Sequence, residues 1–134
     1  MAGKLNEKAK QLIGSKAFAT LSTVDPDGGP QVSPLWIDMD GDDLLVNTAR
    51  GRTKARNIER DPRVGICIVD PQNPYAGCVA LRGTVVDITT DGADEHIDHL
   101  ASKYLGVETY PNRQAGEVRL KVRIRVDRVA MQPE

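Results

Sequence analysis

The chain is poor in several residue classes, and each shortage excludes a class of protein. Its 134 residues include only two cysteines, and the spacing of Cys67 and Cys78 fits neither a disulfide framework nor a zinc motif. Three tyrosines, one tryptophan and one phenylalanine are too few for a platform that stacks single-stranded nucleic acid. No apolar run approaches the roughly 18 residues that a membrane span needs. We therefore expect a cytoplasmic protein with two reduced thiols inside strands and no membrane or nucleic-acid partner.

The chain as a whole also has no large excess of positive or negative charge. The 18 basic and 19 acidic residues give a formal net charge of −1, so the molecule as a whole does not attract polyanions. Hydrophobic residues make up 40% of the chain, which is typical of a globular protein and argues against disorder. The length corresponds to one domain, which we place over residues 1–134.

The hydrophobic pattern predicts a mainly β fold with flanking helices. Apolar residues at helical spacing favour helices over 5–14, over 52–60 with Thr53 as its cap, and from about 90 to 105. Short runs of β-branched and apolar residues bounded by turn residues favour six strands, over 17–24, 31–39, 44–48, 64–69, 77–88 and 118–126. Tight turns join the first three strands, so we expect a six-stranded antiparallel barrel, whose closure removes exposed sheet edges.

Two details of these elements are informative. Gly83, inside a long strand, indicates a bulge or a bend at a barrel corner. In the last strand, apolar residues from Val118 to Val126 alternate with Arg119 and further charged residues, which predicts one dry face and one solvated face. On the last helix, His96 and His99 are three residues apart, but the apolar stripe runs through Ile97 and other positions. We expect both histidines to be solvated rather than to bind a metal.

The basic stretch from Arg50 to Arg63 is the strongest candidate for a binding site. It holds six cations and two acids in fourteen residues, and it falls where a strand ends and a helix begins. Free backbone N–H groups and the positive end of the helix dipole then favour an anion such as a phosphate. A solvated charged surface would show the same composition. The sequence has neither GxGxxG nor GxxxxGK, which argues against a nucleotide fold of Rossmann or P-loop type.

The segment from Lys54 to Val64 resembles the KxRNxxRDPRV signature of the split β-barrel flavin and deazaflavin reductases, which are relatives of pyridoxamine 5′-phosphate oxidase. The resemblance extends to the segment from Phe18 to Trp36 and to Leu81–Val85, and it is closest to the branch that uses coenzyme F420, the FDOR-B group. It implies an FMN-binding-type split barrel that works as a homodimer with its site at the subunit interface.

The resemblance also implies roles for individual residues. The cofactor phosphate would contact Arg52, Lys54, Arg56 and Asn57. The cofactor ring would lie near Gln31, Ser33, Pro34, Trp36, Asn47 and Thr48, and Tyr75 would cover the ring of the partner subunit. Simpler interpretations stay open for some of these residues. Trp36 suits a core position, Tyr75 a loop anchor, and Gln31 and Ser33 an exposed strand face.

The implied activity is an F420-dependent oxidoreductase that moves a hydride between coenzyme F420 and an electron-poor small molecule such as an enone, a quinone or a tetrapyrrole. The cofactor supplies the redox chemistry, so we assign no catalytic residue and no metal ligand. Two alternatives remain: an FMN-binding oxidoreductase, and a protein that binds a cofactor or another planar ligand without turnover. A nucleic-acid-binding module is the weakest alternative, because the chain is acidic overall and has few aromatic residues.

Overall fold

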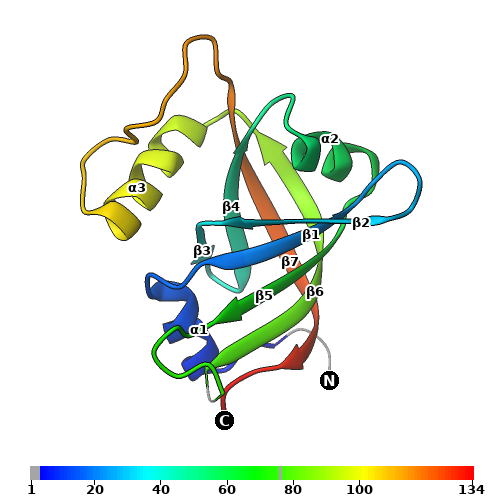
Figure 1. Cartoon of the computed structure of the whole chain (residues 1–134), viewed down its shortest axis with the longest axis vertical. Coiled ribbons are helices and arrows are strands. Elements are labelled where there is room, and N and C mark those ends of the chain that lie inside the picture. Colours follow the sequence, from blue (N-terminus) through cyan, green and yellow to red (C-terminus); the bar gives the residue numbers. More distant parts are fainter. Residues whose placement is uncertain (1–3, 76) are drawn as a thin grey trace.

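The computed structural model describes residues 4–75 and 77–134, which form three helices around one antiparallel sheet (Figure 1). The elements follow the chain in the order α1 (Glu7–Gly14), β1 (Ala19–Val24), β2 (Pro30–Leu35), β3 (Ile37–Asp40), β4 (Asp43–Ala49), α2 (Thr53–Arg60), β5 (Arg63–Val69), β6 (Cys78–Thr89), α3 (Ala93–Leu105) and β7 (Arg119–Met131). The predicted class, a mainly β barrel with flanking helices, is confirmed. None of the described helices is long and apolar enough to cross a membrane.

The sheet is seven-stranded, in the order β2-β1-β5-β6-β7-β4-β3. The predicted count was six, because residues 31–39 were expected to form one strand. In the structure this segment changes partners at Trp36. Leu35 pairs with Ala19 on β1, whereas Ile37 pairs with Val46 on β4.

This change of partners closes the barrel. Strands β2 and β3 lie at opposite edges of the sheet, yet the single residue Trp36 separates them in the chain. The sheet must therefore curl until its two edges meet. The long strands β6 and β7 cross behind the shorter ones and give the curl its depth (Figure 1). The edges are joined by the chain at Trp36 and are not hydrogen-bonded to each other, as expected for a split barrel.

The core fills the barrel interior, and the inward face of every strand contributes to it. Among its fully buried members are Ile37, Leu44, Ile68, Val79 and Ile124. Helix α1 covers one end, because Ala9, Leu12 and Ile13 face the barrel on one side of the helix.

The predicted irregularity at Gly83 is present. The pairing of β6 with β7 shifts register between Arg82 and Gly83, which is a bulge. A Cβ at Gly83 would lie 2.7 Å from both Arg125 O and Ile124 Cγ2, so the close approach of β7 requires glycine there.

Helix α3 lies outside the barrel against β4 and β7 (Figure 1). It begins at Ala93, slightly later than predicted, and glycines in the left-handed conformation flank both its ends. Its buried stripe runs from Ala93 through Ile97 and Leu100 to Tyr104. Leu105 was expected on this stripe but is 49% exposed, because it is the last residue of the helix and points past the sheet.

The helix cap predicted at Thr53 is wrong by one residue. Arg52 is the capping residue of α2, its side chain makes no capping hydrogen bond, and Thr53 is the first helical residue. Arginine has no side-chain acceptor, so Arg52 leaves the first N–H groups of α2 without a side-chain cap of its own. The two cysteines are free and lie in strands, as expected: Cys67 lies within β5, and Cys78 is the first residue of β6. Their Sγ atoms are 4.0 Å apart.

Candidate functional site

A pocket of about 210 Å³ lies between α3, the start of α2 and the chain crossing at Trp36. Strands β4 and β7 form its floor, and the loop that follows α3 forms part of its rim. It is lined by Phe18, Pro34, Leu35, Trp36, Asn47, Arg52, Lys54, Ile97, Leu100, Tyr110, Asn112 and Arg119. One end of this pocket is aromatic and the other is basic.

At the aromatic end, Trp36 is stacked on Tyr104 with the ring centroids 5.3 Å apart and the planes 7° apart. Tyr110 meets the indole edge-on at 6.0 Å, and Phe18 meets Tyr104 edge-on at 5.4 Å. The Tyr104 hydroxyl donates to Ala17 O at 2.7 Å, and burial raises the pKa of this phenol. Tyr104 is thus a fixed, neutral support, and Trp36 presents a rigid flat surface on which a planar ligand can stack.

At the basic end, Arg52, Lys54 and Arg119 converge from α2 and β7. The burial of Lys54, and then the neighbouring charges of Arg52 and Arg119, lower the pKa of its ammonium group below 10.5. Three cations brought together at a partly buried position favour an anion, and the uncapped N-terminus of α2 adds its dipole to the same end.

A chain of hydrogen bonds holds Arg119 in place. The Arg119 Nε–H donates to Asn47 Oδ1 at 2.8 Å, and the Asn47 amide donates to Ala93 O at 2.9 Å and to His96 Nδ1 at 3.1 Å. His96 Nε2 then faces Asp38 Oδ1 at 3.1 Å. This pattern calls for the neutral His96 tautomer that carries its proton on Nε2. The chain, which we call the Arg119 relay, joins α3 to β3, β4 and β7.

The relay corrects the prediction for one of the histidines. His96 was expected to be solvated, but it is 7% exposed, because it lies four residues before Leu100 on the buried stripe of α3. His99 is solvated as predicted, with a side chain 68% exposed at 3.6 Å from Asp38. The described residues contain no group of three or more side chains that could hold a metal ion.

The burial of Arg119 also differs from the prediction. This residue was assigned to the solvated face of β7, yet it is 4% exposed, whereas its neighbour Val118 is 37% exposed. Helix α3 and Tyr110 cover this end of the strand, and the guanidinium carbon lies 5.2 Å from the Tyr110 ring centroid. The strand alternation alone carries no signal for this covering, because α3 and Tyr110 lie elsewhere in the chain.

The pocket brings together five of the eleven predicted site residues, namely Pro34, Trp36, Asn47, Arg52 and Lys54. Asn47 is 7% exposed, and its side-chain amide accepts from Arg119 and donates to Ala93 O. It therefore holds Arg119 in place at the basic end. Trp36 is half-buried against the Tyr104 cluster, so it belongs both to the packing of α3 and to the pocket wall.

The other predicted residues lie outside this pocket. Asn57 donates to Thr23 Oγ1 and Asp25 Oδ1, and Thr23 donates to Gln31, so these side chains tie α2 to the hairpin of β1 and β2. The hydroxyl oxygens of Ser33 and Thr48 are buried without a hydrogen-bond partner among residues 4–75 and 77–134. The side chains of Arg56 and Tyr75 are exposed. The predicted contacts of these six residues with a cofactor stay predictions.

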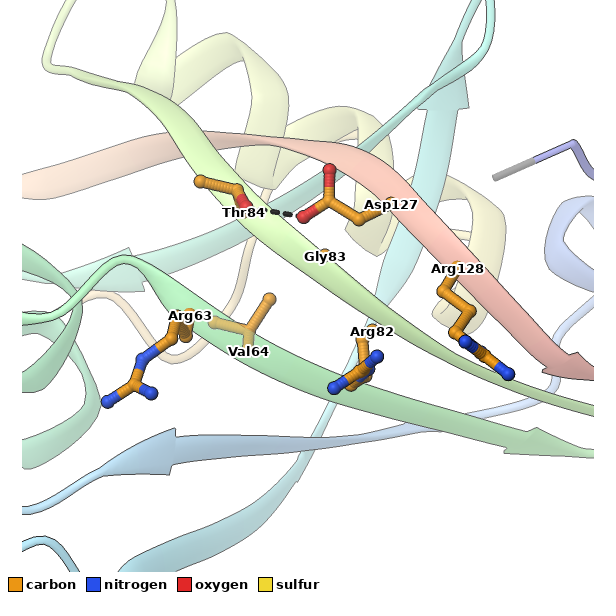
Figure 2. A pocket seen from close by; sticks show the side chains of 7 residues that line it. All are labelled: Arg63, Val64, Arg82, Gly83, Thr84, Asp127 and Arg128. Carbon is orange, nitrogen blue, oxygen red and sulfur yellow. Dashed lines mark hydrogen bonds between the residues drawn. The ribbon is translucent and has the colours of Figure 1, made fainter. Parts of the chain in front are cut away.

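A second, larger hollow of about 560 Å³ lies on strands β5, β6 and β7 (Figure 2). Arg63, Arg82 and Arg128 extend along it, and Thr84 is hydrogen-bonded to Asp127 between them. All three arginines are exposed, and Arg63 is paired with Asp61 at 2.7 Å. Its lining contains no aromatic ring and none of the predicted site residues. The smaller pocket is therefore the better candidate site, because it combines a flat aromatic wall with a buried cation.

Comparison with known proteins agrees with the split-barrel fold. The family model described as pyridoxamine 5′-phosphate oxidase matches residues 5–132, nearly the whole chain. The chain belongs to this family. The predicted membership of the split-barrel flavin and deazaflavin group is thereby confirmed.

Solved structures of other proteins superimpose on nearly the whole chain. An F420 reductase is 32% identical to the chain, with a TM-score of 0.83 over 94% of this chain and 98% of that one. A conserved hypothetical protein from Mycobacterium tuberculosis is 23% identical, with a TM-score of 0.69 over 94% and 83% of the two chains. General Stress Protein 26 from Bacillus anthracis is 20% identical, with a TM-score of 0.69 over 96% and 94%. The last two show the fold alone.

The Arg119 relay yields a prediction about stability. Replacing Asn47 with alanine removes its bonds to Ala93, His96 and Arg119 and leaves a buried guanidinium N–H unpaired. We expect the free energy of unfolding to fall by about 2–4 kcal/mol, as measured by urea denaturation. Asn112→Ala, at the exposed rim of the same pocket, should change it by less than about 0.5 kcal/mol. Equal effects of the two substitutions would show that the relay does not support the pocket.

Proposed function

We propose that the chain is an oxidoreductase that binds coenzyme F420 in the pocket between α2 and α3 and reduces an electron-poor organic molecule of the enone, quinone or tetrapyrrole type. The observation that carries the proposal is the joining of a flat aromatic wall to three converging cations in one pocket. The family and the 32% identity to an F420 reductase support it. FMN is the second candidate cofactor, because the family model is that of pyridoxamine 5′-phosphate oxidase.

The residues of the pocket suit such a group. The nitrogens of Arg52, Lys54 and Arg119 are the donors that a phosphate requires, and the Arg119 Nη1 atom is buried without a hydrogen-bond partner among the described residues. Trp36 would support one face of the ring, and the apolar side chains of α3 would exclude water beside it. When bound, the deazaflavin would supply the hydride. We assign no side chain as an acid or base, since the product could take its proton from water or from a hydroxyl group.

The pocket of one protomer is smaller than such a ligand needs. Its volume of about 210 Å³ is below the roughly 300–1,000 Å³ of most ligand sites. We propose that a second copy of the chain completes the site in a homodimer, with its Tyr75 over the ring. The full exposure of Tyr75 and the 57% exposure of Phe18 at the pocket rim support this arrangement.

The proposed homodimer can be tested by measuring the mass of the protein in solution. Light scattering after size-exclusion chromatography should give twice the 14.6 kDa of one chain at micromolar concentration. A mass of one chain, at concentrations where the cofactor binds, would rule out a site that is shared between subunits.

The function is tested by titrating the protein with F420 and with FMN side by side. Replacing Lys54 with alanine removes a charge-assisted bond, so the affinity for the preferred cofactor should fall about tenfold to a hundredfold, on the order of 1.5–3 kcal/mol. Fluorescence or absorbance of the ring measures binding. The control Lys10→Ala removes an exposed pair with Asp42 at 3.4 Å and should leave the affinity unchanged. Unchanged affinity in the Lys54 variant would refute the phosphate assignment.

The lowered pKa of Lys54 predicts a pH dependence. As pH rises, Lys54 loses its proton before an exposed lysine with a pKa of 10.5 would, and the neutral amine no longer attracts a phosphate. Affinity should therefore fall as pH passes through this lowered pKa, and binding should take up a proton in that range. Calorimetry in buffers of different ionisation enthalpy counts these protons. Lys54→Arg should keep its affinity to higher pH, because arginine stays charged. Identical pH profiles would contradict the prediction.

A further inference from the structure

The basic end of the pocket already holds an anion, which is a side chain of this protein. Glu117 lies two residues before the start of β7, and its side chain is 7% exposed. Its Oε2 lies 3.4 Å from Arg52 Nη2, and its Oε1 lies 3.2 Å from Arg119 Nη1. The carboxylate therefore sits between two of the three cations that the proposed function assigns to a phosphate.

The contacts of this carboxylate are incomplete. Oε1 of Glu117 and Nη1 of Arg119 are both buried, and in the described part of the chain neither has a partner in hydrogen-bonding geometry, although they are close enough to attract as charges. A buried polar atom without a hydrogen bond costs free energy. The Arg52 contact is also longer than the 2.7–2.9 Å of a strong charge-assisted bond. Glu117 thus offsets one positive charge of the site and leaves hydrogen-bond donors unsatisfied.

The charges indicate which ligand would do better than Glu117. Arg52, Lys54 and Arg119 contribute three positive charges and Glu117 one negative charge, which leaves an excess of two. A ligand carboxylate would replace Glu117 with the same group and gain little. Inorganic phosphate or a phosphate monoester carries up to two charges and at least three strong acceptor oxygens, so it can bond to donors that Glu117 leaves unpaired.

The segment that precedes Glu117 is open to solvent. Gly116 precedes it with φ +75°, and the residues from Pro111 to Gly116 are exposed. In Figure 1 this segment is the orange loop that rises above the sheet between α3 and β7. A rotation of the Glu117 side chain toward this loop brings the carboxylate to water without a change in the pairing of β7.

We propose that Glu117 is a built-in occupant of the anion subsite and that a ligand phosphate must displace it to bind. This rests on the proposed function only in taking the phosphate to be that of the cofactor. The competition itself is a property of Arg52, Arg119 and Glu117.

The test is a calorimetric titration of the full chain with inorganic phosphate at constant ionic strength. Glu117→Gln removes the competing charge and should bind phosphate about tenfold more tightly than the wild type. Glu117→Asp keeps the charge but shortens the side chain by one methylene group, so it should bind at least about threefold more tightly. The matched control Glu108→Gln removes an exposed charge from the same loop and should have no effect.

Each result decides the proposal. Wild-type or weaker affinity in both Glu117 variants would overturn it, and so would an equal gain in Glu108→Gln, which would point to net charge alone. Thermal unfolding of each variant shows whether it is folded, and if Glu117→Gln does not fold, Glu117→Asp decides. Acetate should gain affinity between wild type and Glu117→Gln by a factor similar to that of phosphate, because both anions must displace the same carboxylate from Arg52 and Arg119.

The two proposals can fail separately. If wild-type protein binds F420 or FMN in a Lys54-dependent way but the Glu117 variants bind phosphate no better, the competition is refuted and the cofactor site stands. If the Glu117 variants gain phosphate affinity but no form binds either cofactor, the competition stands and the proposed function is refuted.

Discussion

The bond between Arg119 and Asn47 is the contact on which the pocket depends. A guanidinium that is 4% exposed must be paired and hydrogen-bonded, because burying it alone would cost more free energy than a small domain can lose. Asn47 accepts from Arg119 and donates to α3, so the same amide that satisfies the charge also fixes the helix over the sheet. The position of α3 in turn fixes Ile97 and Leu100 in the pocket wall. The Asn47 amide therefore fixes both the packing of α3 on the sheet and the position of the Arg119 guanidinium.

The aromatic end is tied to the fold in a comparable way. Trp36 is both the residue at which the chain passes from one sheet edge to the other and the flat surface of the pocket. Its stacking on Tyr104, whose hydroxyl donates to the chain just before β1, connects the closure of the barrel to α3. A ligand on this surface would contact a part of the molecule that has little freedom to move, which reduces the entropy lost on binding.

Local sequence patterns predicted those structural features that depend only on residues close together in the chain. The three helices, the long strands and the bulge at Gly83 follow from spacing and from glycine chemistry. The strand over 31–39 was predicted as one element because turn residues bound it on both sides, at Gly28-Gly29 and at Asp40-Gly41, and nothing local indicates a change of partners at Trp36. Arg119 and His96 were assigned to water because alternation and helical spacing describe one element at a time. Their burial arises where α3 meets β4 and β7, which are far apart in the sequence. Lys54 was found because it begins a motif, and Arg52 because it lies in the basic stretch around that motif, whereas Glu117 belongs to neither.

The closure at Trp36 has a consequence for how this domain can change over evolutionary time. A single residue spans the two sheet edges, so an inserted residue there would shift the register of β2 or β3 and turn its apolar side chains outward. The exposed loop between α3 and β7 has no such restriction, and Tyr110 and Asn112 in it line the same pocket. Insertions and deletions can accumulate on one wall of the pocket while the opposite wall keeps its length. Related domains can therefore diversify in the molecules they accept through that loop alone.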